Sequence, residues 1–128
     1  KRVLEKFGGR AVCFMSDPDV AAEARERGET RATVSMERAA ALDGPLVLAI
    51  GNAPTALLEL GELIRGGALS PALVIGVPVG FVNVVEAKEL ILSAGVPCIV
   101  ARGRKGGSNV AAAICNALLY QASNNARE

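Results

Sequence analysis

The basic loop of residues 102–108, RGRKGGS, places three cationic side chains among three glycines. The forked guanidinium groups of Arg102 and Arg104 match carboxylates in bidentate geometry. Glycine lets the backbone approach a ligand closely and leaves its N–H groups free to face it. An alanine-rich, helix-forming run follows, and a helix start adds partial positive charge. The loop therefore predicts an anion-binding site that contains Gly103, Gly106 and Gly107.

The spacing within this loop does not fit the standard phosphate motifs. Lys105 precedes two glycines instead of standing next to Ser or Thr, and the glycines lack the GxGxxG pattern. No acidic residue closely follows the second predicted strand, where a ribose partner would be needed. Nucleotide binding therefore remains an alternative that no recognised sequence motif supports. Ser108 either caps the next helix, its more common role, or donates to a ligand.

Two further glycine-containing loops follow apolar runs, GNAPT at residues 51–55 and VPVGFVN at residues 77–83. Each has a structural alternative. Asn52 would cap a helix that has Pro54 in its first turn, and residues 77–83 would be a plain connection. Taken together with the basic loop and Arg31, they favour a binding surface for a large acidic ligand.

The elements that position these loops are short apolar strands alternating with helices. The strands are expected at residues 11–15, 45–50, 71–76 and 96–101. Apolar runs without alternation are typical of a parallel sheet, so we predict an α/β fold with a mostly parallel sheet and helices on both faces. Ligands of such sheets bind at the carboxyl ends of the strands, where all three loops would lie. We expect one domain over residues 1–128, with a frayed tail at 122–128.

Composition excludes several function classes. The 128 residues carry a net charge of +1 and only 3% aromatic residues, which disfavours nucleic-acid binding. The uncharged stretch 66–85 is interrupted by Pro71 and Pro78, so no membrane span is expected. The chain has no histidine and no CxxC pair, and we expect neither a metal nor a cofactor.

Catalytic groups are scarce in the sequence. No nucleophile stands beside a base, and no catalytic residue can be identified from the residues alone. Cys13, Cys98 and Cys115 lie in apolar runs and are expected to be core thiols of a reducing, cytoplasmic protein. The residues by themselves therefore favour a binding protein over an enzyme.

Three blocks together resemble the precorrin-8X methylmutase family of cobalamin biosynthesis. They are GNAPTALLEL, PALVIGVPVGFVNVVEAKE and RGRKGGSNVAAAICNAL, in the family's order and with roughly its spacing. The similarity extends to DPDVAAEARERGETRA, which ends near Thr30 and Arg31, and it covers nearly the whole chain.

The resemblance implies an isomerase that moves a methyl group from C-11 to C-12 of precorrin-8X or cobalt-precorrin-8, giving hydrogenobyrinate or cobyrinate. This tetrapyrrole carries many carboxylates, as the loops independently predict. The resemblance also implies a homodimer, and the uncharged last helix is a candidate to face the partner. The residues that it implies for substrate binding are Thr30, Arg31, Gly51, Asn52, Ala53, Pro54, Thr55, Pro78, Val79, Gly80, Phe81, Arg102, Gly103, Arg104, Gly106, Gly107 and Ser108.

The chain departs from the family pattern in two respects. The histidine that the family uses near the macrocycle is absent, so we expect the chain to be a C-terminal portion that lacks an N-terminal part of the fold and is inactive alone. The alternative is a non-catalytic tetrapyrrole-binding relative. In addition, Asn83 and Ala87 stand where the family usually has Gly and Ser.

Overall fold

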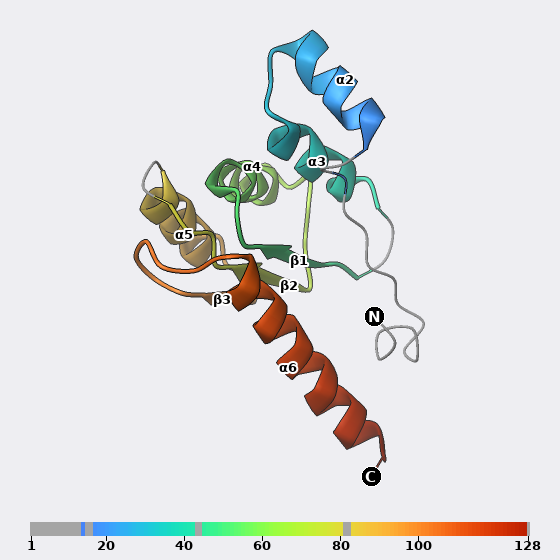
Figure 1. The fold of residues 1–128 in the computed structure, drawn as a ribbon, viewed down its shortest axis with the longest axis vertical. Coiled ribbons are helices and arrows are strands. Elements are labelled where there is room, and N and C mark those ends of the chain that lie inside the picture. The colour runs from blue at the N-terminus through green and yellow to red at the C-terminus, as the bar shows by residue number, and fades with distance from the viewer. Residues whose placement is uncertain (1–13, 15–16, 43–44, 81–82, 128) are drawn as a thin grey trace.

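The computed structural model describes residue 14 and residues 17–42, 45–80 and 83–127. In chain order the elements are α2 (Pro18–Arg27), α3 (Arg31–Ala40), β1 (Val47–Ile50), α4 (Pro54–Arg65), β2 (Leu73–Gly76), α5 (Val84–Ser93), β3 (Cys98–Val100) and α6 (Ser108–Arg127). Figure 1 shows the sheet at the centre, with α2 and α3 beyond α4 at one end and α6 extending away at the other.

The described strands form one parallel sheet in the order β1-β2-β3. The register pairs Ile50 with Gly76 and Gly76 with Val100, so the three strands end level with one another. The predicted parallel α/β architecture is confirmed. Its carboxyl edge carries the connections that lead into α4, α5 and α6.

Helices cover both faces of the sheet, because side chains of β2 alternate between two cores. Val74 belongs to the larger core, with Leu57 and Leu60 of α4 and Ile91 of α5. Ile75 and Val77 face the other side, where Ala111, Ile114 and Cys115 of α6 pack against them. Within the larger core, truncating a fully buried leucine such as Leu57 would cost roughly 2–5 kcal/mol.

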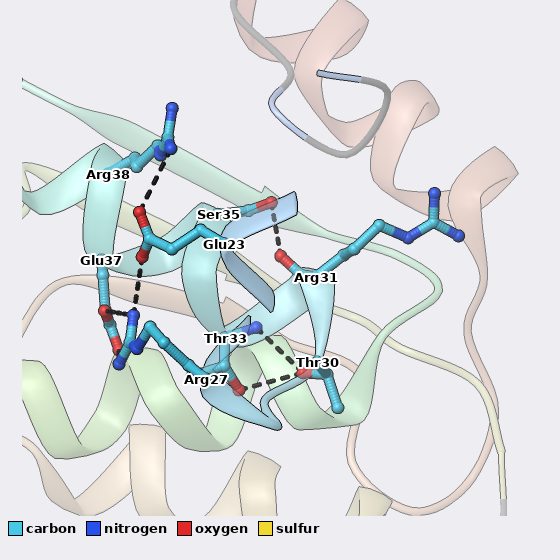
Figure 2. Close-up of polar contacts among 8 residues, drawn as sticks. All are labelled: Glu23, Arg27, Thr30, Arg31, Thr33, Ser35, Glu37 and Arg38. Carbon is cyan, nitrogen blue, oxygen red and sulfur yellow. Dashed lines mark hydrogen bonds and ion pairs between the residues drawn. The ribbon is translucent and has the colours of Figure 1, made fainter. Parts of the chain in front are cut away.

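Helix α2 packs on α3, and α3 packs on α4 (Figure 1). Arg27 joins the two helices, since its guanidinium bonds Glu23 at 2.7 Å and both carboxylate oxygens of Glu37 at 2.7 and 3.0 Å (Figure 2). Arg38 also reaches Glu23, at 3.2 Å. Hydrogen bonds from Arg27 and Arg38 hold the pKa of the Glu23 carboxyl below its usual value. These contacts fix the turn from which Thr30 and Arg31 emerge.

The three described strands start at residues 47, 73 and 98, each two residues later than expected. α3 begins at Arg31, because Thr30 caps it by accepting the Thr33 N–H at 3.1 Å. α6 continues to Arg127, and no Gly or Pro in 109–127 interrupts the helix. The strand expected at 11–15 lies almost entirely outside the described residues.

Only the first turns of α6 pack against the sheet, through Ala111, Ile114 and Cys115. Farther along, the helix projects from the body (Figure 1), and Leu118 and Tyr120 are exposed. Val47 of β1 is 58% exposed, so this strand also has an uncovered apolar residue. Among the described residues, no helix combines the length and apolarity that crossing a bilayer requires.

Candidate functional site

Residues 51–55 and 102–108 meet backbone to backbone. A Cβ added at Gly51 would lie 2.6 Å from the Cα of Ser108 and 2.9 Å from the carbonyl oxygen of Gly107. Such distances leave no room for a side chain, so this contact requires glycine at position 51. The loop after β1 is thereby held against the start of α6.

The segment after β2 contacts the loops on either side of it. The Gly107 N–H donates to the Val77 carbonyl oxygen at 2.8 Å, and a Cβ at Gly106 would collide with the same carbonyl group. The segment also approaches residues 51–55, since a Cβ at Gly80 would lie 3.7 Å from Cγ of Pro54. The predicted convergence of the three loops is therefore confirmed.

We call this surface the three-loop rim, comprising residues 51–55, 77–80 and 102–108. It brings together most of the predicted site residues: Gly51, Asn52, Ala53, Pro54, Thr55, Pro78, Val79, Gly80, Arg102, Gly103, Arg104, Gly106, Gly107 and Ser108. Pro78 is buried, whereas Val79 is 44% exposed. Phe81 lies outside the described residues.

The cationic side chains of the basic loop differ in their partners. Arg102 donates to both carboxylate oxygens of Glu89 at 3.1 Å, but the two side chains are 72% and 48% exposed, so the pair contributes little stability. Arg104 and Lys105 are exposed, and neither forms an ion pair with any other described residue. The rim thus carries two uncompensated positive charges beside the N-terminus of α6, an arrangement that attracts anions.

Two residues assigned a capping alternative do not cap. The N-cap of α4 is Ala53, which makes no side-chain cap bond, and Asn52 is exposed. At α6, the carbonyl of Gly107 accepts the Ala111 N–H at 3.0 Å, so Ser108 is already the first helical residue. The Ser108 hydroxyl is exposed and has no hydrogen bond within the described part of the chain. Both polar side chains are therefore available to a ligand.

Lys88 of α5 was not identified from the sequence, although it contacts the basic loop most directly. Its side chain is 1% exposed, and Nζ donates to the carbonyl oxygens of Gly103 and Lys105, both at 2.8 Å. Burial lowers the pKa of its ammonium group. The sequence does indicate that Lys88 is buried, because it lies on the same helix face as the apolar residues Val84, Ala87 and Ile91.

Asn83 stands immediately before α5 with φ +60°, in the left-handed region. Asparagine is one of the few residues besides glycine that adopt this conformation readily. The departure from the family pattern at this position is therefore accommodated by the backbone. Ala87 is fully buried, so the second departure lies in the core.

Thr30 and Arg31 lie at the start of α3 and do not belong to the three-loop rim. Thr30 accepts the Thr33 N–H and donates to the Thr33 hydroxyl at 3.0 Å, which gives it a structural role (Figure 2). The exposed Arg31 side chain points away from the ion pairs around Arg27 (Figure 2). Across the described residues, no hydrogen bond or ion pair joins Thr30 or Arg31 to the three-loop rim.

The rim offers donors and charge more than reactive groups. The free thiols of Cys98, in β3, and Cys115, in α6, are half-buried and belong to the two different cores. In the described ranges, no three Cys, Asp or Glu residues cluster closely enough to hold a metal ion. The arrangement is therefore suited to bind and orient an anionic ligand.

Comparisons with known proteins agree on one family. A family model described as precorrin-8X methylmutase matches residues 1–121. The cobalt-precorrin-8 methylmutase of Leptospira interrogans is 44% identical over 128 residues, which cover 94% of this chain and 58% of the relative. The precorrin-8X methylmutase of Pseudomonas aeruginosa is 49% identical over 112 residues, covering 85% of this chain and 53% of the relative.

Solved structures give the same result. The precorrin-8X methylmutase of Thermus thermophilus superposes with a TM-score of 0.84 at 44% identity, covering 97% of this chain and 60% of that one. A precorrin-8X methylmutase related protein gives a TM-score of 0.78 at 30% identity, with coverage of 94% and 67%. The chain spans between half and three fifths of the length of these curated relatives.

Proposed function

Because the chain belongs to the precorrin-8X methylmutase family, we propose that its three-loop rim binds the corrinoid substrate of a corrin-ring isomerase. The substrate is precorrin-8X or cobalt-precorrin-8, and the reaction moves the ring methyl group from C-11 to C-12. The observation that carries this proposal is the backbone contact of three glycine loops around the exposed cations Arg104 and Lys105. Such a surface suits the many carboxylates of a tetrapyrrole.

In this reaction the residues of the rim bind, orient and shield the macrocycle. Methyl migration needs the substrate held in one geometry, water excluded, and one proton placed correctly. Arg104 and Arg31 supply contacts for carboxylates, while Asn52 and Ser108 donate from the two helix starts. The chain contains no histidine, so the proton-transfer residue implied for the family is contributed from outside these residues.

Anaerobic incubation of the chain with precorrin-8X, followed through its visible spectrum, tests this assignment. We expect a protein-dependent spectral shift that reports binding, without conversion to hydrogenobyrinate. ATP and NAD, added in excess, should leave the shift unchanged, because the rim has no phosphate or ribose motif. Absence of a shift, or displacement by either nucleotide, would contradict corrinoid binding. Full turnover would contradict the proposal that a residue outside these 128 transfers the proton.

A homodimer and a cytoplasmic location belong to the same proposal. The exposed Val47, Leu118 and Tyr120 are apolar or aromatic residues that a second copy would cover. The free thiols Cys98 and Cys115 support a reducing compartment. Light scattering of the purified chain should then give twice the mass of one chain, and a monomer at micromolar concentration would contradict the dimer.

A further inference from the structure

Lys88 connects two parts of the chain that are separated by β3. It lies in the second turn of α5, and its ammonium group donates to Gly103 and Lys105 in the basic loop. Both acceptors are main-chain carbonyl oxygens, and the side chain is 1% exposed. The lysine therefore contacts the backbone of the loop and not its side chains.

These two bonds fix the peptide groups on either side of Arg104 and Lys105. The Gly103 carbonyl belongs to the peptide that precedes Arg104, and the Lys105 carbonyl belongs to the peptide that follows Lys105. Their oxygens point to the buried ammonium, so these negative dipole ends do not face an anionic ligand on the exposed side. The two bonds to the buried Lys88 ammonium thereby fix the backbone conformation that presents Arg104 to solvent.

Burying an ammonium group costs desolvation free energy, which a paired carboxylate would offset. Lys88 donates only to carbonyl oxygens, and no described carboxylate pairs with its charge. An apolar side chain of the same length would pack at this position without desolvation cost. The structure therefore carries a charge here for its effect on the loop.

We infer that Lys88 is a positioning residue that holds the basic loop in its ligand-binding conformation and so preorganises Arg104 for a substrate carboxylate. The inference rests on the proposed function for its ligand, although the effect on the loop can be measured without ligand. Preorganisation raises affinity because the loop need not be ordered on binding.

The test compares Lys88→Met with the unaltered 128-residue chain. Backbone ¹⁵N order parameters are expected to fall below about 0.6 at residues 103–106, while those of β2 stay near about 0.85. The Kd for hydrogenobyrinate is expected to rise about tenfold or more, because the unaligned loop must be ordered on binding. In Lys88→Ala, n-propylamine replaces the missing atoms and should restore loop order and affinity, whereas n-propanol should not.

Lys105→Met is the matched control, since it removes one charge from the same loop without touching the anchor. It should leave the order parameters of residues 103–106 unchanged. If Lys88→Met keeps an ordered loop and full affinity, the inference is overturned. If both Lys88 variants fail to fold even with propylamine, Lys88 determines the fold and the inference is equally overturned.

The two proposals can fail separately. If the unaltered chain does not bind hydrogenobyrinate, the proposed function is wrong and Lys88 preorganises nothing for that ligand. The order parameters then still decide whether Lys88 holds the loop. If the unaltered chain binds and Lys88→Met binds equally well, only the role of Lys88 is wrong.

Discussion

Gly106→Ala is expected to lower the free energy of unfolding by about 3 kcal/mol or more, as overpacking against rigid backbone does. A Cβ at this position would collide with the Val77 carbonyl group and lie 3.0 Å from the Pro78 carbonyl oxygen. Relief requires the basic loop to move away from residues 77–80, which would break the Gly107–Val77 hydrogen bond. Urea unfolding followed by circular dichroism measures the loss.

Gly28→Ala provides the control for backbone strain without a clash. Gly28 ends α2 with φ +66°, and a Cβ there would meet nothing within 4 Å. Its replacement should cost only about 1 kcal/mol, the usual penalty for a left-handed residue. Equal losses for the two variants would show that the close contact between the loops does not exist in solution.

Arg104→Ala is expected to raise the Kd for hydrogenobyrinate by about 10- to 100-fold, because a charge-assisted hydrogen bond contributes about 1.5–3 kcal/mol. The free energy of unfolding of this variant should change by less than about 0.5 kcal/mol, since the Arg104 side chain is exposed and forms no ion pair with the described residues. Arg31→Ala should weaken binding in the same direction. Isothermal titration at two salt concentrations measures both effects, and the affinity of the unaltered chain should fall with salt.

Arg65→Ala is the matched control for charge. Arg65 is an exposed arginine in the last turn of α4, at the end of the helix opposite residues 51–55. Its replacement removes the same charge far from the rim and should leave the affinity within about twofold, because exposed charges beyond a Debye length are screened. If Arg65→Ala weakens binding as much as Arg104→Ala, the affinity reflects net charge and not a site.

The fold was largely predictable because its signals are local. Apolar runs without alternation predict strands at residues 45–50, 71–76 and 96–101, and the structure has them at 47–50, 73–76 and 98–100. Thr30, which the family resemblance implies for substrate binding, is the N-cap of α3 in the structure. Helix ends depend on a few side-chain bonds, and these compete with other uses of the same residues.

The site was predictable only in outline. Parallel topology alone placed the three loops on one edge. The capping alternatives for Asn52 and Ser108 were wrong, because residue type does not specify which residue occupies the N-cap. The contact of Gly106 and Gly107 with Val77 sets the start of α6 at Ser108. Pairing of Lys88 with residues 103 and 105, and of Arg102 with Glu89, spans 13 to 17 residues. Such tertiary contacts have no local signature.

The central claim is that three separate loops form one corrinoid-binding surface. Amide chemical shifts of the ¹⁵N-labelled chain, recorded during titration with hydrogenobyrinate, test it most directly. We expect the largest changes to fall together on residues 51–55, 77–80 and 102–108, with one common Kd, and the methyl-esterified ligand to cause none of them. Changes confined to α2 or to the exposed part of α6, or identical changes with the ester, would contradict it.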